Sequence, residues 1–374
     1  MRASRPDDRR WPALDGLRAF AIAAVMLFHL VLKHVLPGGE VGVDVFFVLS
    51  GFLITSLVVG EFDKHGSLDL RSFYARRALR LFPALAAVVV LAIVLVSVVD
   101  SLDTSYGHET IAWLPFTIFY IGNWARVLQP AAMGLLAHTW TLSIEEQFYL
   151  IWPLCFLLFA ARSRRHLTAI TLAALAFADI IYSEVLLSFG VSFNRIYNGT
   201  DTHAEGLLLG CALAFWVASG RVPTAESFKR GCDWATVASA VGLVALSQFI
   251  PLSPMTSAVA TPLASIFAAI ILLNQVTMPH RLLRRLLTLH PVLWVGRRSY
   301  GLYLWHLPVY LYLATFTLSG PHRDTESELA LLKLAVSVVL AAGSYRFLEQ
   351  PILTKWKARF QRTEAFPEGT PVES

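Results

Sequence analysis

Arg18 and His29 are two ionisable residues within the otherwise apolar segment LDGLRAFAIAAVMLFHLVL. Their spacing is close to three helical turns, so a helix presents both side chains on nearly the same face, roughly 16 Å apart along its axis. An ionisable residue inside a membrane span is costly to bury and is by default functional. A neutral imidazole accepts a proton from a hydroxyl group. The pair predicts a polar seam along one membrane helix, with a packing role for His29 as the alternative.

Several further polar residues are expected at the depth of His29. They are Asp44, Glu145, Glu146, Asp201, His203 and Glu205. A carboxylate beside a histidine orients the ring and stabilises its imidazolium form, and we predict that Glu145 or Asp44 does so for His29. For Glu145 and Glu146 the alternative is an acidic pair favoured by the helix dipole.

A second group of residues is expected at the opposite membrane face. Its members are Arg18, Arg76, Arg77, Arg80, Tyr300 and Arg346. Guanidinium groups bind phosphate in bidentate geometry, which favours this group as a phosphate-binding site. Membrane anchoring and contact with phospholipid headgroups are the alternative. His306 is expected nearer mid-membrane, where it faces either the polar seam or a packed neighbour.

The composition indicates which elements hold these residues. The chain has 374 residues, of which 56% are hydrophobic and 15% charged, whereas soluble domains carry about 25% charged residues. Apolar runs of about 20 residues, long enough to span a bilayer, recur throughout. The sequence predicts an all-α polytopic membrane protein of about ten transmembrane helices. The expected spans are 13–33, 41–59, 82–99, 138–161, 167–189, 203–219, 233–250, 258–277, 293–317 and 328–348.

The distribution of basic residues predicts the orientation. With the N-terminus inside, cytoplasmic segments hold 24 of the 31 Lys and Arg residues, as the positive-inside rule requires. An eleventh span at 110–128 would spoil this bias, so we interpret that aromatic segment, interrupted by Pro115, as interfacial or re-entrant. Both termini are then cytoplasmic. The predicted organisation is an N-tail 1–12, a transmembrane domain 13–350 and a partly disordered C-tail 351–374, with the first span retained rather than cleaved.

Familiar soluble-enzyme and metal motifs are absent. Cys155, Cys211 and Cys232 are too few and too scattered for a disulfide framework or a CxxC site. There is no P-loop, GxGxxG, GxSxG or HExxH pattern. We expect no metal site and no permanently bound cofactor, and the net charge of +5 reflects membrane topology rather than nucleic-acid binding.

Six segments, in order, resemble blocks of the acyltransferase-three family of integral membrane O-acyltransferases. They are LDGLRAFAIAAVMLFH, GVDVFFVLSGFLI, FYARRALRLFP, HTWTLSIEEQFYLIWP, DTHAEGLLLGCALA and SYGLYLWHLP. The resemblance covers essentially every predicted span. Where many members read D-T-R-x-D, this chain has Asp201-Thr202-His203-Ala204-Glu205. Many bacterial relatives carry a C-terminal esterase-like domain, and the sequence leads us to expect a stand-alone form.

The resemblance implies an acyl-CoA-dependent O-acyltransferase in the bacterial cytoplasmic membrane. The family moves acyl groups, usually acetyl from acetyl-CoA, to hydroxyls of surface polysaccharides, lipid-linked sugars or macrolide-type small molecules. For this chain it implies His29 as the essential histidine, Glu145 as its acidic partner, and Arg18 with the Arg76–Arg77–Arg80 group on the acyl-CoA side.

The expected mechanism joins these assignments. Acyl-CoA docks from the cytoplasm, and His29 activates an acceptor hydroxyl that enters from outside or from the outer leaflet. Direct transfer and an acyl-histidine intermediate both fit the sequence. Glu146, Asp201, His306 and Trp140 are the expected acceptor-binding residues, although Trp140 also suits an interfacial anchor. The alternative function is a transporter or flippase that relays protons through the buried His and Glu residues.

Overall fold

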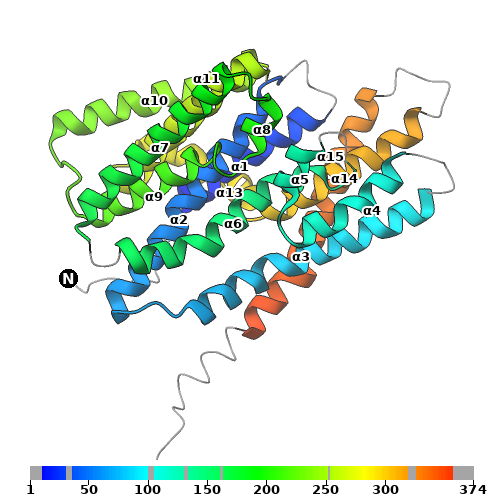
Figure 1. Ribbon diagram of the computed structural model, residues 1–374, viewed down its shortest axis with the longest axis horizontal. Coiled ribbons are helices and arrows are strands. Elements are labelled where there is room, and N and C mark those ends of the chain that lie inside the picture. The colour runs from blue at the N-terminus through cyan, green and yellow to red at the C-terminus, as the bar shows by residue number, and fades with distance from the viewer. Residues whose placement is uncertain are drawn as a thin grey trace, which may run out of the picture.

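The computed structural model describes residues 11–30, 36–99, 105–129, 134–160, 163–251, 253–318 and 326–356. Every regular element within these residues is helical, which confirms the predicted all-α class (Figure 1). Most of the predicted N-tail 1–12 and of the C-tail 351–374 lies outside the described residues.

A helix overlaps each predicted span. The helices are α1 (Pro12–His29), α2 (Gly42–His65), α3 (Leu70–Val99), α6 (Trp140–Cys155), α7 (Arg165–Ser188), α9 (Glu205–Ala218), α10 (Glu226–Phe249), α11 (Pro254–Thr277), α14 (Ser299–Leu318) and α15 (Glu326–Ser344). In the described part of the chain, seven helical stretches are long and apolar enough to cross a membrane. The protein is therefore a multi-pass membrane protein, and the count of ten spans stays a prediction.

The shorter helices connect these spans. They are α4 (Ser105–Ile118), α5 (Gly122–Leu128), α8 (Phe193–Asn198), α12 (Arg281–Leu287) and α13 (His290–Gly296). The aromatic segment 110–128 is divided between α4 and α5, and the break falls at Tyr120, which has a positive φ of 53°. It therefore forms two short helices instead of one continuous one.

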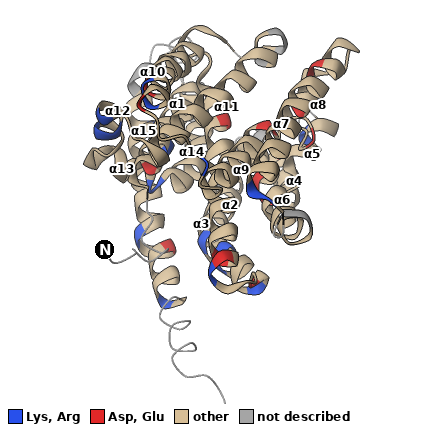
Figure 2. Cartoon of the chain, turned by 90° about the vertical axis from the view of Figure 1, so that its left-hand side faces the viewer, with Lys and Arg blue, Asp and Glu red and all other residues tan. Residues whose placement is uncertain are grey.

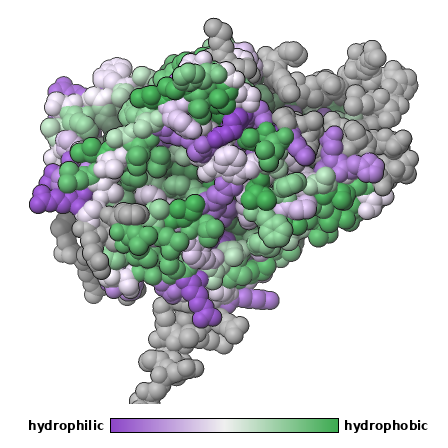
Figure 3. All heavy atoms as spheres, in the orientation of Figure 1, coloured by the Kyte–Doolittle hydropathy of each residue, from purple (hydrophilic) through white to green (hydrophobic). Residues whose placement is uncertain are grey.

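Helices α1 and α2 lie at the centre of the bundle (Figure 1). On one side α2 packs against α9 and α11, with α7 and α10 outside them. On the other side α1 packs against α14, which contacts α3 and α15. Outer helices turn apolar side chains outward, as Leu167, Ile170 and Phe177 of α7 do. Apolar residues cover much of the described surface on the face shown in Figure 3, as a lipid-facing surface requires.

Glycines bring the central helices unusually close together. A Cβ on Gly51 of α2 would lie 2.0 Å from the Leu207 carbonyl oxygen, and one on Gly210 of α9 would lie 2.2 Å from the Val48 carbonyl oxygen. Only residues without a side chain allow this approach, and small residues are typical of helix interfaces within membranes.

One end of the bundle, here called the basic end, contains the α2–α3 turn, the α9–α10 connection and helix α12. Figure 2 faces this end, and blue segments of the cartoon mark Lys and Arg residues on α12 and around the α2–α3 turn. Ion pairs link neighbouring segments at the basic end: Arg76 is 3.0 Å from Glu61, and Arg165 pairs with Asp63. Hydrogen bonds from Ser72 lower the pKa of Asp69, which precedes α3.

Candidate active site

His29 is the last residue of α1 and lies in a cluster of three histidine rings. Its ring centroid is 5.1 Å from that of His306 on α14, and the His306 centroid is 5.2 Å from that of His138, which precedes α6. The Nδ1 atom of His29 is 2.9 Å from the Val25 carbonyl oxygen. Because a carbonyl only accepts, Nδ1 carries the proton in the neutral ring, and Nε2 is the nitrogen that can accept one.

Several polar atoms of this histidine cluster are buried without a partner. Within the described residues, both ring nitrogens of His138, Nε2 of His306 and the hydroxyl of Tyr310 have no hydrogen bond. The Tyr310 and His306 ring centroids are 5.6 Å apart. A buried polar atom without a partner costs about 1–3 kcal/mol, so such atoms gather where a ligand or an ordered water binds. The histidine cluster therefore resembles a ligand-binding site more than a protein core in which every polar group is hydrogen-bonded.

Tyr303 fixes the position of His138. Its hydroxyl donates to the His138 carbonyl oxygen at 2.7 Å and lies 2.6 Å from the Thr141 Oγ1 atom, which ties α14 to the start of α6. The sequence interpretation included His306 but not His138 or Tyr303. His138 begins the segment HTWTLSIEEQFYLIWP, whose start is predicted at the membrane depth of His29. This shared depth is the sequence signal that could have identified His138.

The two glutamates of α6 lie among polar residues of α2 and α3. Arg77 binds Glu146 with two hydrogen bonds, 2.6 Å from Nη2 to Oε1 and 3.1 Å from Nε to Oε2. The Arg77 guanidinium also lies 3.1 Å from the centre of the Tyr149 ring. Glu145 accepts a hydrogen bond from the Ser50 hydroxyl at 2.7 Å. The predicted bond from Glu145 to His29 stays a prediction.

The other predicted donor-site residues lie nearer the basic end. Arg18 is 3.6 Å from Asp15, and Arg80 lies within electrostatic range of Arg18 and Arg77. The Tyr300 hydroxyl donates to the Leu81 carbonyl oxygen at 3.0 Å. Arg80 and Arg346 are exposed, while Arg76 is held by Glu61. The structure thus brings Arg18, Arg77, Arg80 and Tyr300 together, and these residues are called the arginine cluster below.

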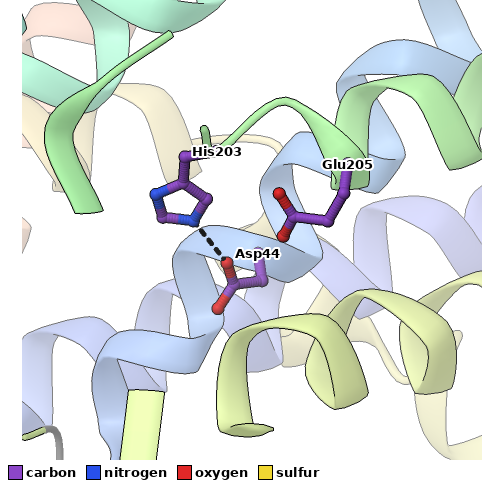
Figure 4. A group of neighbouring side chains, drawn as sticks. All are labelled: Asp44, His203 and Glu205. Carbon is purple, nitrogen blue, oxygen red and sulfur yellow. Dashed lines mark hydrogen bonds and ion pairs between the residues drawn. The ribbon is translucent and has the colours of Figure 1, made fainter. Parts of the chain in front are cut away.

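Asp44 belongs to a third group, with His203 and Glu205 at the start of α9 (Figure 4). The Nε2 atom of His203 is 2.9 Å from Asp44 Oδ1, and its Nδ1 atom is 2.7 Å from the Tyr197 carbonyl oxygen. The sequence predicted Asp44 as a carboxylate partner of His29. In the structure Asp44 is instead hydrogen-bonded to His203.

The remaining predicted acceptor-binding residues lie around this third group. The Trp140 ring centroid is 6.0 Å from that of His203. Asp201 is exposed and pairs with Arg195 at 2.6 Å. A groove between α7, α8 and α11 adjoins the group and is lined by Ser183, Glu184, Leu187, Tyr197, His203 and Glu205.

These features define a polytopic helical membrane protein in which α1 and α14 both connect the arginine cluster with the histidine cluster. Arg18 and His29 lie on α1, and Tyr300 and His306 lie on α14. The chain belongs to the acyltransferase-three family, because the family model, described as an acyltransferase domain, matches residues 11–345. This confirms the resemblance inferred from the sequence.

Two curated relatives of the chain are bacterial O-acetyltransferases. The peptidoglycan O-acetyltransferase OatA of Listeria monocytogenes is 34% identical over 372 residues, which cover 94% of this chain and 57% of that protein. The O-acetyltransferase OatA of Staphylococcus aureus (strain MRSA252) is 32% identical over 387 residues, covering 95% of this chain and 61% of that protein. The chain thus spans less than two thirds of the length of these relatives. No solved structure matches it.

Proposed function

We propose that this protein is a membrane O-acyltransferase that moves an acetyl group from acetyl-CoA to a hydroxyl of a cell-wall glycan. Membership of the acyltransferase-three family supports the reaction class. The glycan acceptor is proposed because a relative that aligns with 94% of this chain is a peptidoglycan O-acetyltransferase. The observation that carries the proposal is the pair of clusters on α1, with guanidinium groups around Arg18 and imidazoles around His29.

The arginine cluster is the proposed donor site. Guanidinium groups suit the phosphates of acetyl-CoA, and the predicted cytoplasmic position of the basic end suits a cytoplasmic donor. Arg77 is already bound to Glu146, whereas Arg80 and Arg346 are exposed. Arg18 and Arg80 are therefore the proposed phosphate ligands, with Arg346 at the entrance, and Arg77 holds α3 against α6. The extended pantetheine arm then runs between α1 and α14 towards His29.

The proposed chemistry occurs at Nε2 of His29. This nitrogen removes the proton of the acceptor hydroxyl while the hydroxyl oxygen attacks the thioester carbonyl carbon. The carbon–sulfur bond breaks, and the CoA thiolate leaves with the proton that His29 received. The unpartnered nitrogens of His138 and His306 provide hydrogen-bonding sites for the acceptor hydroxyl or a bound water. In the acyl-histidine route the same Nε2 first attacks the thioester carbon and expels the CoA thiolate. The acceptor oxygen then takes the acetyl group from Nε2, and the proton of its hydroxyl ends on the thiolate.

The proposal is tested with the purified full-length protein in nanodiscs, using acetyl-CoA and soluble peptidoglycan fragments. We expect release of free CoA thiol that depends on the fragments. His29→Ala is expected to lower this rate by at least ~10²-fold, the usual contribution of a general base. His108→Ala, an exposed histidine of α4, is the matched control and keeps the rate.

Two outcomes would overturn the proposal. Acceptor-dependent thiol release by His29→Ala at the wild-type rate removes both chemical routes. Absence of thiol release from a folded wild-type protein with every glycan fragment tested removes acyl transfer to cell-wall glycans. Radiolabel from acetyl-CoA that stays on the protein when acceptor is omitted distinguishes the acyl-histidine route from direct transfer.

A further inference from the structure

Asp44, His203 and Glu205 form a buried group whose chemistry the proposed acyl transfer does not use (Figure 4). Each residue is 3% exposed or less. One nitrogen or carboxylate oxygen from each residue lies within 4.8 Å of the corresponding atoms of the other two. We propose that these three side chains bind a divalent transition-metal ion, Zn²⁺ or Mn²⁺.

The hydrogen bonds of His203 orient it as a metal ligand. Its Nδ1 atom lies 2.7 Å from the Tyr197 carbonyl oxygen, so this nitrogen must carry a proton. The neutral ring then turns the Nε2 lone pair towards Asp44 Oδ1, 2.9 Å away. Two acceptors face each other there, and a proton or a cation must lie between them. An Nδ1–H bond to a backbone carbonyl is the usual outer-shell support of a metal-binding histidine.

The surrounding charges favour a cation over a single proton. Besides Asp44 and Glu205, the neighbourhood contains Asp179, which accepts a hydrogen bond from the Ala204 amide at 3.1 Å. Glu40 lies on the other side and accepts from the Tyr197 hydroxyl at 3.3 Å. The nearby Arg195 forms an ion pair with Asp201. A divalent ion at this point would balance the charge of both carboxylates, and buried carboxylates require such compensation.

The donor set and geometry fit a transition metal. Imidazole with two carboxylates suits Zn²⁺ or Mn²⁺, whereas Mg²⁺ and Ca²⁺ prefer oxygen ligands alone. A tetrahedral ion about 2.1 Å from each ligand holds the ligand atoms about 3.4 Å apart. The present separations reach this arrangement by small side-chain shifts. Ser265 supports Glu205 from the far side, with a hydroxyl that donates to Oε1 at 3.3 Å.

The ion would crosslink α2 to the beginning of α9. Asp44 lies in the first turn of α2, while His203 and Glu205 flank the start of α9. Three protein ligands leave a fourth coordination position, and the groove lined by Tyr197, His203 and Glu205 adjoins it. Water or a hydroxyl-bearing ligand in this groove would complete the coordination. Motif searches miss the site because His203 and Asp44 are separated by 159 residues.

The test measures metal in the full-length protein, purified in nanodiscs by an affinity tag that contains no histidine. We expect about one zinc or manganese per chain by elemental mass spectrometry, and fewer than ~0.2 per chain in His203→Gln. His290→Gln, an exposed histidine of α13, is the matched control and retains the metal. Stripping the wild type with EDTA is expected to lower its Tm, and adding ZnCl₂ or MnCl₂ restores it.

His203→Arg keeps the test decisive if His203→Gln does not fold. A guanidinium group at this position supplies a fixed positive charge to both carboxylates. We expect this variant to fold without metal, with a Tm that neither EDTA nor Zn²⁺ changes. A folded wild type with substoichiometric metal, and a Tm unchanged by EDTA, Zn²⁺ and Mn²⁺, overturns the proposal and leaves an imidazolium–carboxylate ion pair.

Discussion

At the scale of single residues, the imidazole of His29 is held by its own helix and lies beside the His306 ring, which in turn contacts the His138 ring. The Val25 carbonyl fixes the proton on Nδ1, and the His306 ring lies beside it at 5.1 Å. His138 contributes two unpartnered nitrogens that no packing role requires. Buried polar atoms without a partner destabilise a fold, so His138 is a candidate for a functional role.

His138→Phe tests this interpretation of the histidine cluster. Removing buried unpartnered nitrogens is expected to leave the Tm unchanged or raise it, because their desolvation cost of about 1–3 kcal/mol disappears. The acetyl-transfer rate is expected to fall by about 10²-fold, because a hydrogen-bonding site beside His29 is lost. Thermal unfolding and thiol release measure the two effects on one preparation. A lower Tm with an unchanged transfer rate would instead make His138 a packing residue.

The two carboxylates of α6, Glu145 and Glu146, show that the role of a residue depends on its bonding partner. Glu146 is neutralised by a two-point bond to Arg77, and Glu145 accepts from Ser50. Both glutamates therefore join α6 to α2 and α3. Their acidic character alone does not distinguish this role from proton transfer.

At the scale of elements, the crossing of α2 and α9 positions the third polar group. Gly51 and Gly210 allow the two backbones to approach, and this approach brings Asp44 at the start of α2 beside His203. A wider crossing would separate the carboxylate from the imidazole. The glycines therefore determine a polar contact in which they take no direct part.

Gly51→Ala is expected to destabilise the protein by about 2 kcal/mol, the usual cost of overpacking a rigid contact. The added Cβ would clash with the Leu207 carbonyl group. This group belongs to the backbone of α9 and cannot move away as a flexible side chain could. Gly60→Ala on the same helix is the matched control, because its Cβ meets nothing within 4 Å. It is expected to stabilise α2 by about 0.5–1 kcal/mol through helix propensity. Unfolding in mixed micelles measures both, and equal stability of the two variants would contradict this account of the crossing.

At the scale of the whole molecule, the α2–α3 turn, the α9–α10 connection and α12 lie at one end of the bundle. Arginines gather there, and the histidine cluster lies at the far end of α1. A donor that binds at one face and an acceptor that arrives at the other fit this polarity. The orientation of the bundle in the membrane therefore decides which compartment supplies which substrate.

The positive-inside distribution predicts that the basic end is cytoplasmic. In a Cys155→Ser background, in which the remaining cysteines are buried, Ser188→Cys at the end of α7 should react with a membrane-impermeant maleimide in intact cells. Lys64→Cys at the end of α2 should react only after permeabilisation. Both positions are exposed, so accessibility within the fold does not differ. The reverse labelling pattern would invert the topology and the proposed donor side.

Much of the fold could be predicted because its signals are local. Span length, apolar composition and loop charge are properties of contiguous residues, and helices occur at all ten predicted spans. The site could be predicted only in part. His29 and Arg18 were found because both are anomalous within one apolar helix, whereas the pairing of Asp44 with His203 depends on how two helices cross.

The sequence by itself determined the fold class, the approximate positions of the helices and the family. It also singled out Arg18 and His29, the two ionisable residues within the apolar segment of α1. An apolar run must bury its backbone hydrogen bonds in lipid, and an ionisable residue within it stands out without knowledge of any neighbour. The tertiary structure alone decided the partners: His306 with His29 and with His138, His203 and Glu205 with Asp44, and Arg77 with Glu146. Those contacts join residues on different helices, and side-chain packing and glycine crossings, which no local pattern records, determine which faces meet.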